Sequence, residues 1–181
     1  MRRSISVWTF LTLTALAPCS ASPGAAEPPA AADPGLAAMR ALPLLPGHWE
    51  GGGWMKQGAG ETQRFVGQET VETRLDGRVV LVEGLHWTPD RSRVVHHAFG
   101  VLSWDDETKG YRFSTHLATG RGGDFAVSLE NGALVWEIPG PNGRIRFTIR
   151  IEGDRWHEIG TVEREGKPQQ FFEMDLRRVK G

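Results

Sequence analysis

Two glutamates occupy positions at which a carboxyl group could act as an acid or a base inside a protein. Glu69 shares its strand parity with Phe65 and Val71, and Glu158 shares its parity with Trp156. Because alternate residues of a strand point to the same face, both carboxyl groups are expected to point inward. Burial would raise their pKa values and suit them to proton transfer. The alternatives are a solvated lumen or internal ion pairs with Arg64, Arg112 or Arg155.

Histidines are the second group that could carry chemistry. Five lie beyond the first predicted strand: His86, His96, His97, His116 and His157. His96 and His97 are adjacent, so they point to opposite faces of a strand, and no His-x-His pair occurs. We therefore predict no metal site. With Glu69 and Glu158, His97 is a candidate catalytic residue.

Other catalytic patterns are missing. There is no Gly-x-Ser-x-Gly motif for a serine nucleophile. The Gly120–Gly123 segment lacks the Lys-Ser/Thr pair of a phosphate loop and is expected to be a turn. Catalysis is thus an open alternative, and the sequence favours a protein that is not an enzyme.

The N-terminus has the three parts of an export signal. Arg2 and Arg3 precede an apolar stretch over 5–17, and Cys19-Ser20-Ala21 offers a small-residue cleavage site. We predict a signal peptide over 1–21, an Ala/Pro-rich linker over 22–34 and one domain over 35–181. The protein is then periplasmic or extracellular, and twin-arginine export is an alternative. It contacts a membrane only if Cys19 is lipidated.

Composition limits the partners. The formal net charge is −1, and −3 without the two leader arginines, so no basic face for nucleic acid is expected. Cys19 is the only cysteine, so the domain has no disulfide. The oligomeric state, monomer or dimer, is left open.

A period of two residues runs through the chain after a short helix expected over 35–42. Ile145, Phe147, Ile149 and Ile151 alternate with polar residues, for example. The predicted strands are His48–Lys56, Thr62–Leu75, Val79–Trp87, Val95–Trp104, Tyr111–Leu117, Asp124–Leu129, Ala133–Ile138, Arg144–Ile151, Arg155–Arg164 and Gln169–Arg178. A sheet of about ten strands tends to curl and close. We predict an all-β fold, an up-and-down antiparallel barrel with a short N-terminal helix.

Several motifs resemble a known superfamily. The segment 42–51, Leu-Pro-Leu-Leu-Pro-Gly-His-Trp-Glu-Gly, resembles the opening of calycin barrels, the lipocalins and fatty-acid-binding proteins. Leu75-Asp76-Gly77-Arg78, the segments 100–105 and 108–111, and the closing 173–178 are similar to DUF1579-type and nitrobindin-like barrels. The resemblance implies a barrel with an internal cavity, and for the DUF1579-like group no settled activity.

Structural roles also follow from the resemblance. In calycins a Trp after the opening Gly plugs one barrel end and stacks on an Arg of the last strand, which implies this role for Gly47, Trp49 and Arg178. Nitrobindin-like barrels hold haem through a His of the final strand. Here 169–176 has no His, and His157 or Met174 would be a poor substitute, so we predict no cofactor.

A barrel of this size has more interior than side chains easily fill. We therefore predict that it binds a small apolar or amphipathic ligand in its cavity. The alternatives are an isomerase, lyase or hydrolase using a cavity carboxylate or His, a haem-binding barrel, and a filled scaffold. The predicted ligand-binding residues are Phe65, Glu69, Glu83, His97, Trp104, Phe113, His116, Trp136 and Glu158.

Overall fold

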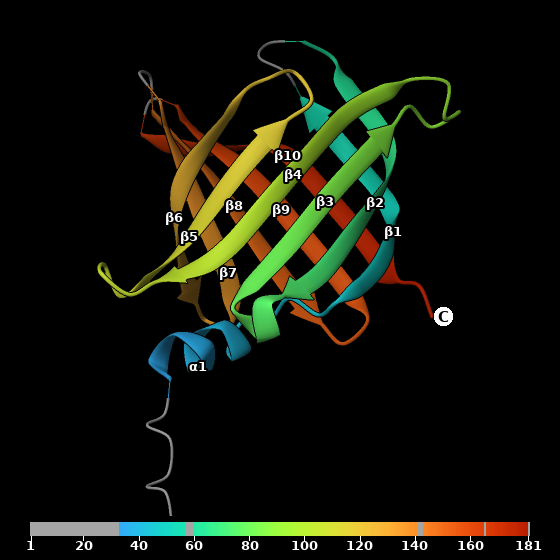
Figure 1. The fold of residues 1–181 in the computed structure, drawn as a ribbon. Coiled ribbons are helices and arrows are strands. Elements are labelled where there is room, and N and C mark those ends of the chain that lie inside the picture. The colour runs from blue at the N-terminus through green and yellow to red at the C-terminus, as the bar shows by residue number, and fades with distance from the viewer. Residues whose placement is uncertain (1–32, 57–59, 141–142, 165, 181) are drawn as a thin grey trace, which may run out of the picture. The chain divides into compact units, whose positions relative to one another are not determined.

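The computed structural model describes residues 33–56, 60–140, 143–164 and 166–180. They form a closed antiparallel barrel of ten strands with one short helix before it (Figure 1), which confirms the predicted fold class. The predicted signal peptide, Cys19 and all but the last two residues of the predicted linker lie outside the described residues. None of the helices in the described ranges has the length and apolar character needed to cross a membrane.

The predicted strands are present, with ends shifted by at most two residues. They are β1 (Gly47–Lys56), β2 (Thr62–Arg74), β3 (Val79–Trp87), β4 (Val94–Asp105), β5 (Gly110–Leu117), β6 (Gly122–Glu130), β7 (Ala133–Gly140), β8 (Gly143–Glu152), β9 (Arg155–Arg164) and β10 (Lys167–Arg178). A short 3₁₀ turn, η1 (Leu75–Gly77), joins β2 to β3 where the Asp76-Gly77 pair predicted a hairpin.

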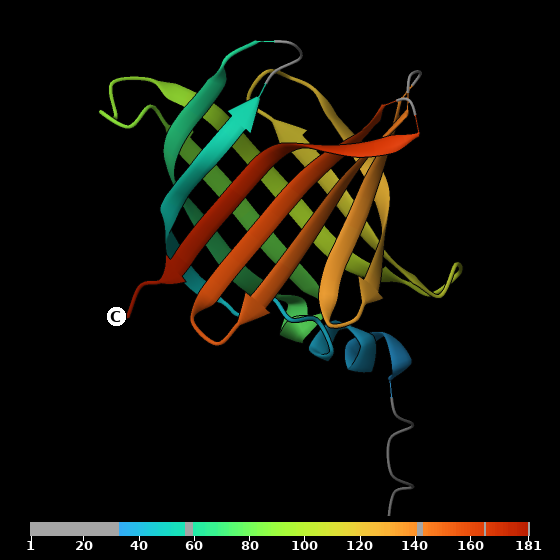
Figure 2. The ribbon, with the colours of Figure 1, turned by 180° about the vertical axis from the view of Figure 1, so that it is seen from behind.

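Each strand pairs with its neighbours in sequence, and β1 pairs with β10 to close the cylinder. In this closing pair Trp49 lies opposite Arg178, and Gly51 lies opposite Leu176. Seen from behind, β8, β9 and β10 complete the wall (Figure 2). Closure leaves no unpaired sheet edge, which is the usual liability of a large antiparallel sheet.

The period of two separates an apolar interior from a charged exterior. On β8, Phe147 and Ile149 face the interior, while Arg144 and Arg146 point outward. Both arginines form ion pairs with Glu137 of β7, at 2.9 Å each. This alternation, visible in the sequence, is what fixes the two faces of the wall.

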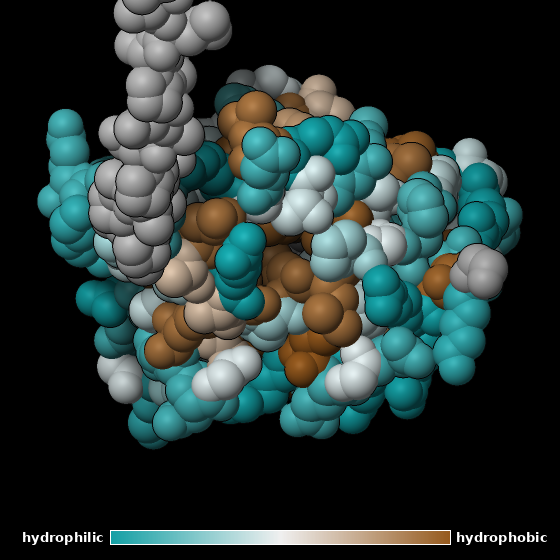
Figure 3. Space-filling view, turned by 60° about the horizontal axis from the view of Figure 1, so that its bottom comes forward, coloured by the Kyte–Doolittle hydropathy of each residue, from teal (hydrophilic) through white to brown (hydrophobic). Residues whose placement is uncertain are grey.

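One end of the barrel is covered by helix α1 (Pro34–Arg40) and the segment that follows it (Figure 1). Asp33 caps the helix by accepting a hydrogen bond from the Leu36 backbone N–H at 2.9 Å, and Pro34 occupies the first turn. Met39, Leu42 and Leu44 are buried there. Viewed toward this end, apolar side chains gather around its centre (Figure 3). We call this the closed end of the barrel.

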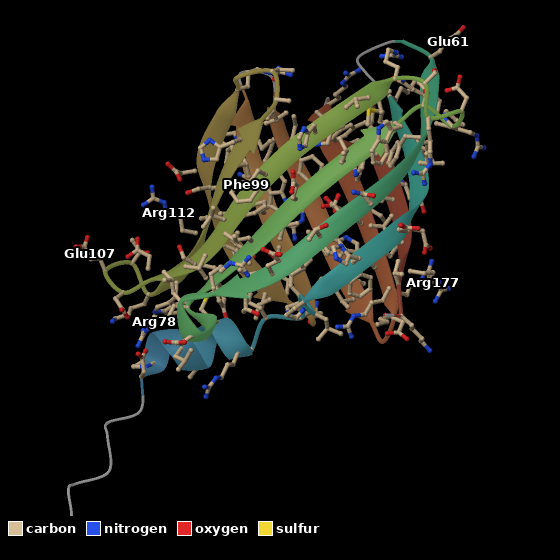
Figure 4. All side chains as sticks on the ribbon, turned by 45° about the vertical axis from the view of Figure 1, so that its right-hand side comes forward. Glu61, Arg78, Phe99, Glu107, Arg112 and Arg177 are labelled. Carbon is tan, nitrogen blue, oxygen red and sulfur yellow. The ribbon has the colours of Figure 1, made fainter. Side chains whose placement is uncertain are left out.

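The other end carries the loops after β1, β3, β5, β7 and β9. Figure 4 shows the two ends: Arg78 lies beside α1, where it forms an ion pair with Asp33, and Glu61 lies at the opposite end. We call the Glu61 end the mouth.

Trp49 plugs the closed end and is fully buried, at 0% exposed. Its indole lies edge-on to Trp156, with ring centroids 5.8 Å apart, and donates a hydrogen bond to the Leu45 carbonyl at 3.2 Å. The Arg178 guanidinium carbon lies 6.0 Å from the centroid of the Trp49 ring. At Gly47, with φ of +142°, a Cβ would come 3.0 Å from Arg178 Nε, so only glycine fits this entry.

Candidate ligand cavity

The barrel encloses a cavity of about 1090 Å³ that runs from Leu44 at the closed end to the mouth. Its wall is mostly apolar. Aromatic side chains supply much of it: Phe113, Phe125, Trp136, Trp156, Phe147, Phe171 and Phe172. Several of these rings also pack on one another, such as Trp136 and Phe147 with centroids 4.5 Å apart. A pocket of this kind suits an apolar molecule.

Inward-facing glycines create room for large neighbours. A Cβ on Gly100 would come 2.3 Å from the Phe113 ring, and a Cβ on Gly160 would come 3.0 Å from the Phe147 ring. Each ring therefore lies flat over a glycine of the adjacent strand instead of pointing straight across the barrel. This arrangement keeps large side chains against the wall and leaves the centre of the barrel open.

A polar cluster interrupts the apolar wall on the β2–β3 side. Glu69 of β2 and His86 of β3 are 6% and 3% exposed, and Glu69 Oε1 lies 3.0 Å from His86 Nε2. The imidazole stacks on Phe65 with centroids 4.6 Å apart. Burial raises the pKa of Glu69 to about 8, with a smaller contribution from the charge of Glu83, and burial lowers the pKa of His86 to about 4.

Glu158 of β9 adds a second buried carboxyl group, 9% exposed. The Trp156 indole N–H donates to its Oε2 at 3.3 Å. Burial first, and then repulsion from Glu69, raise the pKa of Glu158 to about 8, and the Trp156 bond opposes this. Both carboxyl groups line the same cavity, and the charge of Glu69 acts on Glu158, so we treat Glu69 and Glu158 together and call them the floor pair.

His96 of β4 also lines the cavity and packs against His86, with ring centroids 5.2 Å apart. Burial, followed by the charges of His86 and His97, lowers its pKa to about 4. At neutral pH the cluster therefore consists of protonated carboxyl groups and uncharged imidazoles. Such groups offer hydrogen-bond donors and acceptors without a fixed charge.

Some buried polar atoms lack a protein partner. Among the described residues these are His86 Nδ1, Trp104 Nε1 and Trp136 Nε1. An unpaired buried donor costs about 1–3 kcal/mol, so such atoms call for an explanation. Trp136 lines the cavity, and a ligand oxygen could accept its hydrogen bond.

Among the described residues that line the cavity, the Lys and Arg side chains all lie near the mouth. Lys56 ends β1, Arg121 follows β5 and Arg164 ends β9, and all three are exposed while contributing to the lining. The two ends of the cavity therefore differ: basic groups surround the mouth, and acidic groups lie deep inside.

The structure brings six of the nine predicted ligand-binding residues to the interior face. Phe65, Glu69 and Glu158 are buried, and Trp104, Phe113 and Trp136 pack against the core. Phe65 and Trp104 contribute to the core rather than to the lining of the cavity itself.

Glu83, His97 and His116 point out of the barrel, which corrects their predicted place in the cavity. His97 Nε2 lies 2.9 Å from Glu83 Oε1 on the outer face, with the two side chains 40% and 52% exposed. His116 is exposed as well. The physical reason is parity: each is one residue away from an inward position, namely Gly84, His96 and Thr115.

The sequence analysis did not place His86 and His96 in the site, yet both point inward: His96 lines the cavity, and His86 packs behind it against Glu69 and Phe65. Parity was the available signal, because His86 shares it with Val82 and Gly84, and His96 shares it with Ala98. It was weak, because the other faces of β3 and β4 also carry apolar residues. His157, a substitute haem ligand in the sequence analysis, faces outward and lies 3.0 Å from Glu173 Oε1. Within the described ranges, no three His, Cys, Asp or Glu residues are grouped so as to hold a metal ion.

Comparisons with known proteins bear on the fold. No protein-family profile matches the chain. No curated protein matches it either. Among solved structures it is similar to Rv2717c from M. tuberculosis, with a TM-score of 0.59 and 15% identity over 80% of this chain and 97% of that one. It is also similar to the S-type phycobiliprotein lyase CpeS from Guillardia theta, with a TM-score of 0.53 and 12% identity over 80% and 92% of the chains. These neighbours share the antiparallel barrel fold.

Proposed function

We propose that this barrel binds a small, largely apolar molecule in its internal cavity. The observation that carries the proposal is the cavity itself, about 1090 Å³ of space with a wall rich in aromatic side chains. Ligand pockets in proteins commonly have about 300–1,000 Å³ and a few polar groups within an apolar lining. A packed scaffold would have filled this space, since protein interiors are normally close-packed.

The polar groups in the cavity support binding of a specific molecule. Glu69, Glu158 and His96 lie among apolar neighbours, and Trp136 Nε1 has no protein partner. Groups of this kind orient a ligand and discriminate between related molecules. The shared fold with a phycobiliprotein lyase is compatible with a role in handling a small molecule, and the sequence motifs support kinship with the DUF1579-like and nitrobindin-like calycins.

Acid–base catalysis is a second candidate, favoured by the Glu69–His86 contact. A carboxyl group with a pKa of about 8 is close to the value that suits a general acid or base near neutral pH. An isomerase, lyase or hydrolase reaction would use the floor pair as its proton donor or acceptor. Haem binding has less support, because β10 has no His and His157 points outward.

A blocked cavity tests the binding proposal. Ala98 on β4 lines the cavity, whereas Ala126 on β6 is exposed on the outer face. We expect Ala98→Trp to weaken binding of the amphipathic dye 1-anilinonaphthalene-8-sulfonate by at least about tenfold, which corresponds to about 1.4 kcal/mol. Ala126→Trp adds the same side chain outside and should leave the dye affinity unchanged.

Native mass spectrometry of protein purified from its own host provides the second arm. A retained small molecule that is lost in Ala98→Trp and kept in Ala126→Trp would identify the ligand class. Equal dye affinity in both variants and the wild type, together with the absence of any retained molecule, would contradict the proposal.

A further inference from the structure

We propose that the deep end of the cavity binds the protonated amine of an otherwise apolar molecule against the carboxyl groups of Glu69 and Glu158. This inference rests on the proposed function and names the chemical class of its ligand. The observation behind it is two buried acidic groups that line the cavity among apolar side chains, with the uncharged His86 beside Glu69 but no Lys or Arg near either group in the described part of the chain.

The hydrogen-bonding capacity of the floor pair is largely unused. A carboxylate can accept about four hydrogen bonds. Glu69 has one partner, His86, and Glu158 has one, the Trp156 indole. The free oxygen lone pairs belong to side chains that line the cavity. An ammonium group carries three N–H donors and could donate to these free oxygen atoms.

The charge balance favours a cation over an anion at this depth. Two carboxylates buried in one apolar cavity without a counter-charge are unstable, so the empty barrel holds them protonated. A bound ammonium supplies the missing charge, because the attraction between opposite charges is strong where water is excluded. The basic residues Lys56, Arg121 and Arg164 lie around the mouth, where they can attract an anionic or polar outer end of the same ligand.

Few other ionisable groups face the floor pair. Within the described ranges they are His86 of β3 and His96 of β4, with Glu83 on the outer face of β3 acting on Glu69 at a distance. Around this level β1, β8 and β10 contribute glycines and apolar side chains to the interior. Arg178 lies lower, at the Trp49 plug, where it bonds to the Pro46 carbonyl. None of these groups neutralises the two carboxyls.

Binding of an amine would release a proton. In the empty protein both carboxyl groups are mostly protonated at pH 7, since their pKa values are about 8. An aliphatic amine is already protonated at this pH, so at least one carboxyl must ionise to pair with it. The affinity for an amine should therefore rise by up to about tenfold per pH unit from about pH 6 to about pH 8, and then level off.

Three matched probes test this: octylamine, octanol and octanoate, which differ in the head group alone. Calorimetric titration should give the lowest Kd for octylamine, by at least about tenfold over octanol near pH 8. At pH 7, in buffers with different ionisation enthalpies, octylamine binding should release close to one proton per molecule. Octanol should show neither proton release nor pH dependence.

Isosteric variants locate the effect. Glu69→Gln and Glu158→Gln should each weaken octylamine binding by about tenfold or more, whereas octanol binding should change much less. Glu50→Gln changes an exposed carboxylate on the outer face of β1 and serves as the matched control. The proton release of the wild type is a second readout that does not depend on whether the variants fold.

The outcomes separate this inference from the proposed function. Octanol binding without any preference for the amine would overturn the inference and leave the cavity as a binding site. Octanoate binding that is tightest at low pH would mean that the protonated floor pair donates to an anion, which also overturns it. If none of the probes binds, the amine inference fails, and the dye experiment still decides the proposed function.

Discussion

Glu69 and Gly84 lie directly opposite each other on β2 and β3, and the glutamate carboxyl occupies the space where a side chain at 84 would be. A Cβ on Gly84 would come 2.5 Å from Glu69 Oε1. The next pair along the strands, Gly67 of β2 and His86 of β3, has the same arrangement with the glycine on the other strand. A Cβ on Gly67 would come 2.5 Å from the His86 imidazole. Two glycines therefore make room for the buried Glu69–His86 contact.

The first prediction concerns this space. Gly84→Ala should displace the Glu69 carboxyl group, weaken its hydrogen bond to His86, and lower the free energy of unfolding by about 1–3 kcal/mol. Urea denaturation measures the change. Gly110→Ala is the control, because the nearest atom to a Cβ there is 3.7 Å away and the backbone is ordinary. Equal stability of the two variants would show that the glycine is not needed for the contact.

The second prediction is the dependence of stability on pH. Glu69 and Glu158 have pKa values raised from 4.5 to about 8, so the folded state binds more protons than the unfolded state between these values, and stability falls as pH rises through them. His86 and His96 have pKa values lowered from 6.5 to about 4, so they reduce stability as pH falls through that range. Between about pH 4.5 and 6.5 the two effects oppose each other.

Thermal melts should consequently show a plateau over that window and a decline from about pH 6.5 to about pH 8. The decline can reach about 1.4 kcal/mol per pH unit for each carboxyl group. Glu158→Gln removes one of these groups and should flatten the alkaline decline, whereas the exposed Glu50→Gln should not. A wild-type melting temperature that is constant from about pH 6 to about pH 8 would contradict the raised pKa values.

The third prediction concerns the plug of the closed end. Trp49→Ala removes a fully buried indole that packs on Trp156, and it should destabilise the protein by about 3 kcal/mol or more. Trp87→Ala is a matched control, since Trp87 is only partly buried and faces outward beside Arg91. Chemical denaturation should show a much smaller loss for it. Similar losses in the two variants would remove the special role of Trp49.

The fourth prediction compares histidines on the two faces of the wall. His86→Ala leaves Glu69 without its partner and removes the stack on Phe65, so a loss of about 2–4 kcal/mol is expected. His157→Ala breaks a partly exposed contact with Glu173, and its cost should stay within about 0.5–1 kcal/mol. Differential scanning calorimetry of both variants distinguishes the cases, and a reversed order would show that the inner cluster contributes little to stability.

The fold could be predicted from the sequence because its information is local. Alternation such as Ile145, Phe147 and Ile149 identifies a strand with one buried face, and turn residues such as Asp76-Gly77 mark its end. Hairpins between sequence neighbours then leave little choice of topology. Several observed strands extend one or two residues beyond their predicted ends, because hydrogen bonding continues past the last alternating side chain, as at Gly140 of β7.

The site could be predicted only in part. Parity placed Glu69 and Glu158 inside correctly, because each shares a face with large apolar residues. The same rule does not decide Glu83 and His86, because both faces of β3 are apolar: Glu83 shares its parity with Leu81 and Leu85, and His86 shares its parity with Val80 and Val82. What no local pattern contains is the distance across the barrel, which decides that Glu69 and Glu158 influence each other.

We call the pairing of β1 with β10 the seam. An open sheet of consecutive hairpins folds without such a pairing, whereas this barrel must form it to close. Nine of its ten strand pairs join sequence neighbours, and one joins segments more than a hundred residues apart, such as Met55 and Phe172. The local hairpins can assemble early, since short loops cost little entropy to close, whereas the seam needs a long loop. Until it closes, β1 and β10 expose unpaired backbone groups that another chain could join, so the interval before closure is when the protein is most prone to aggregate.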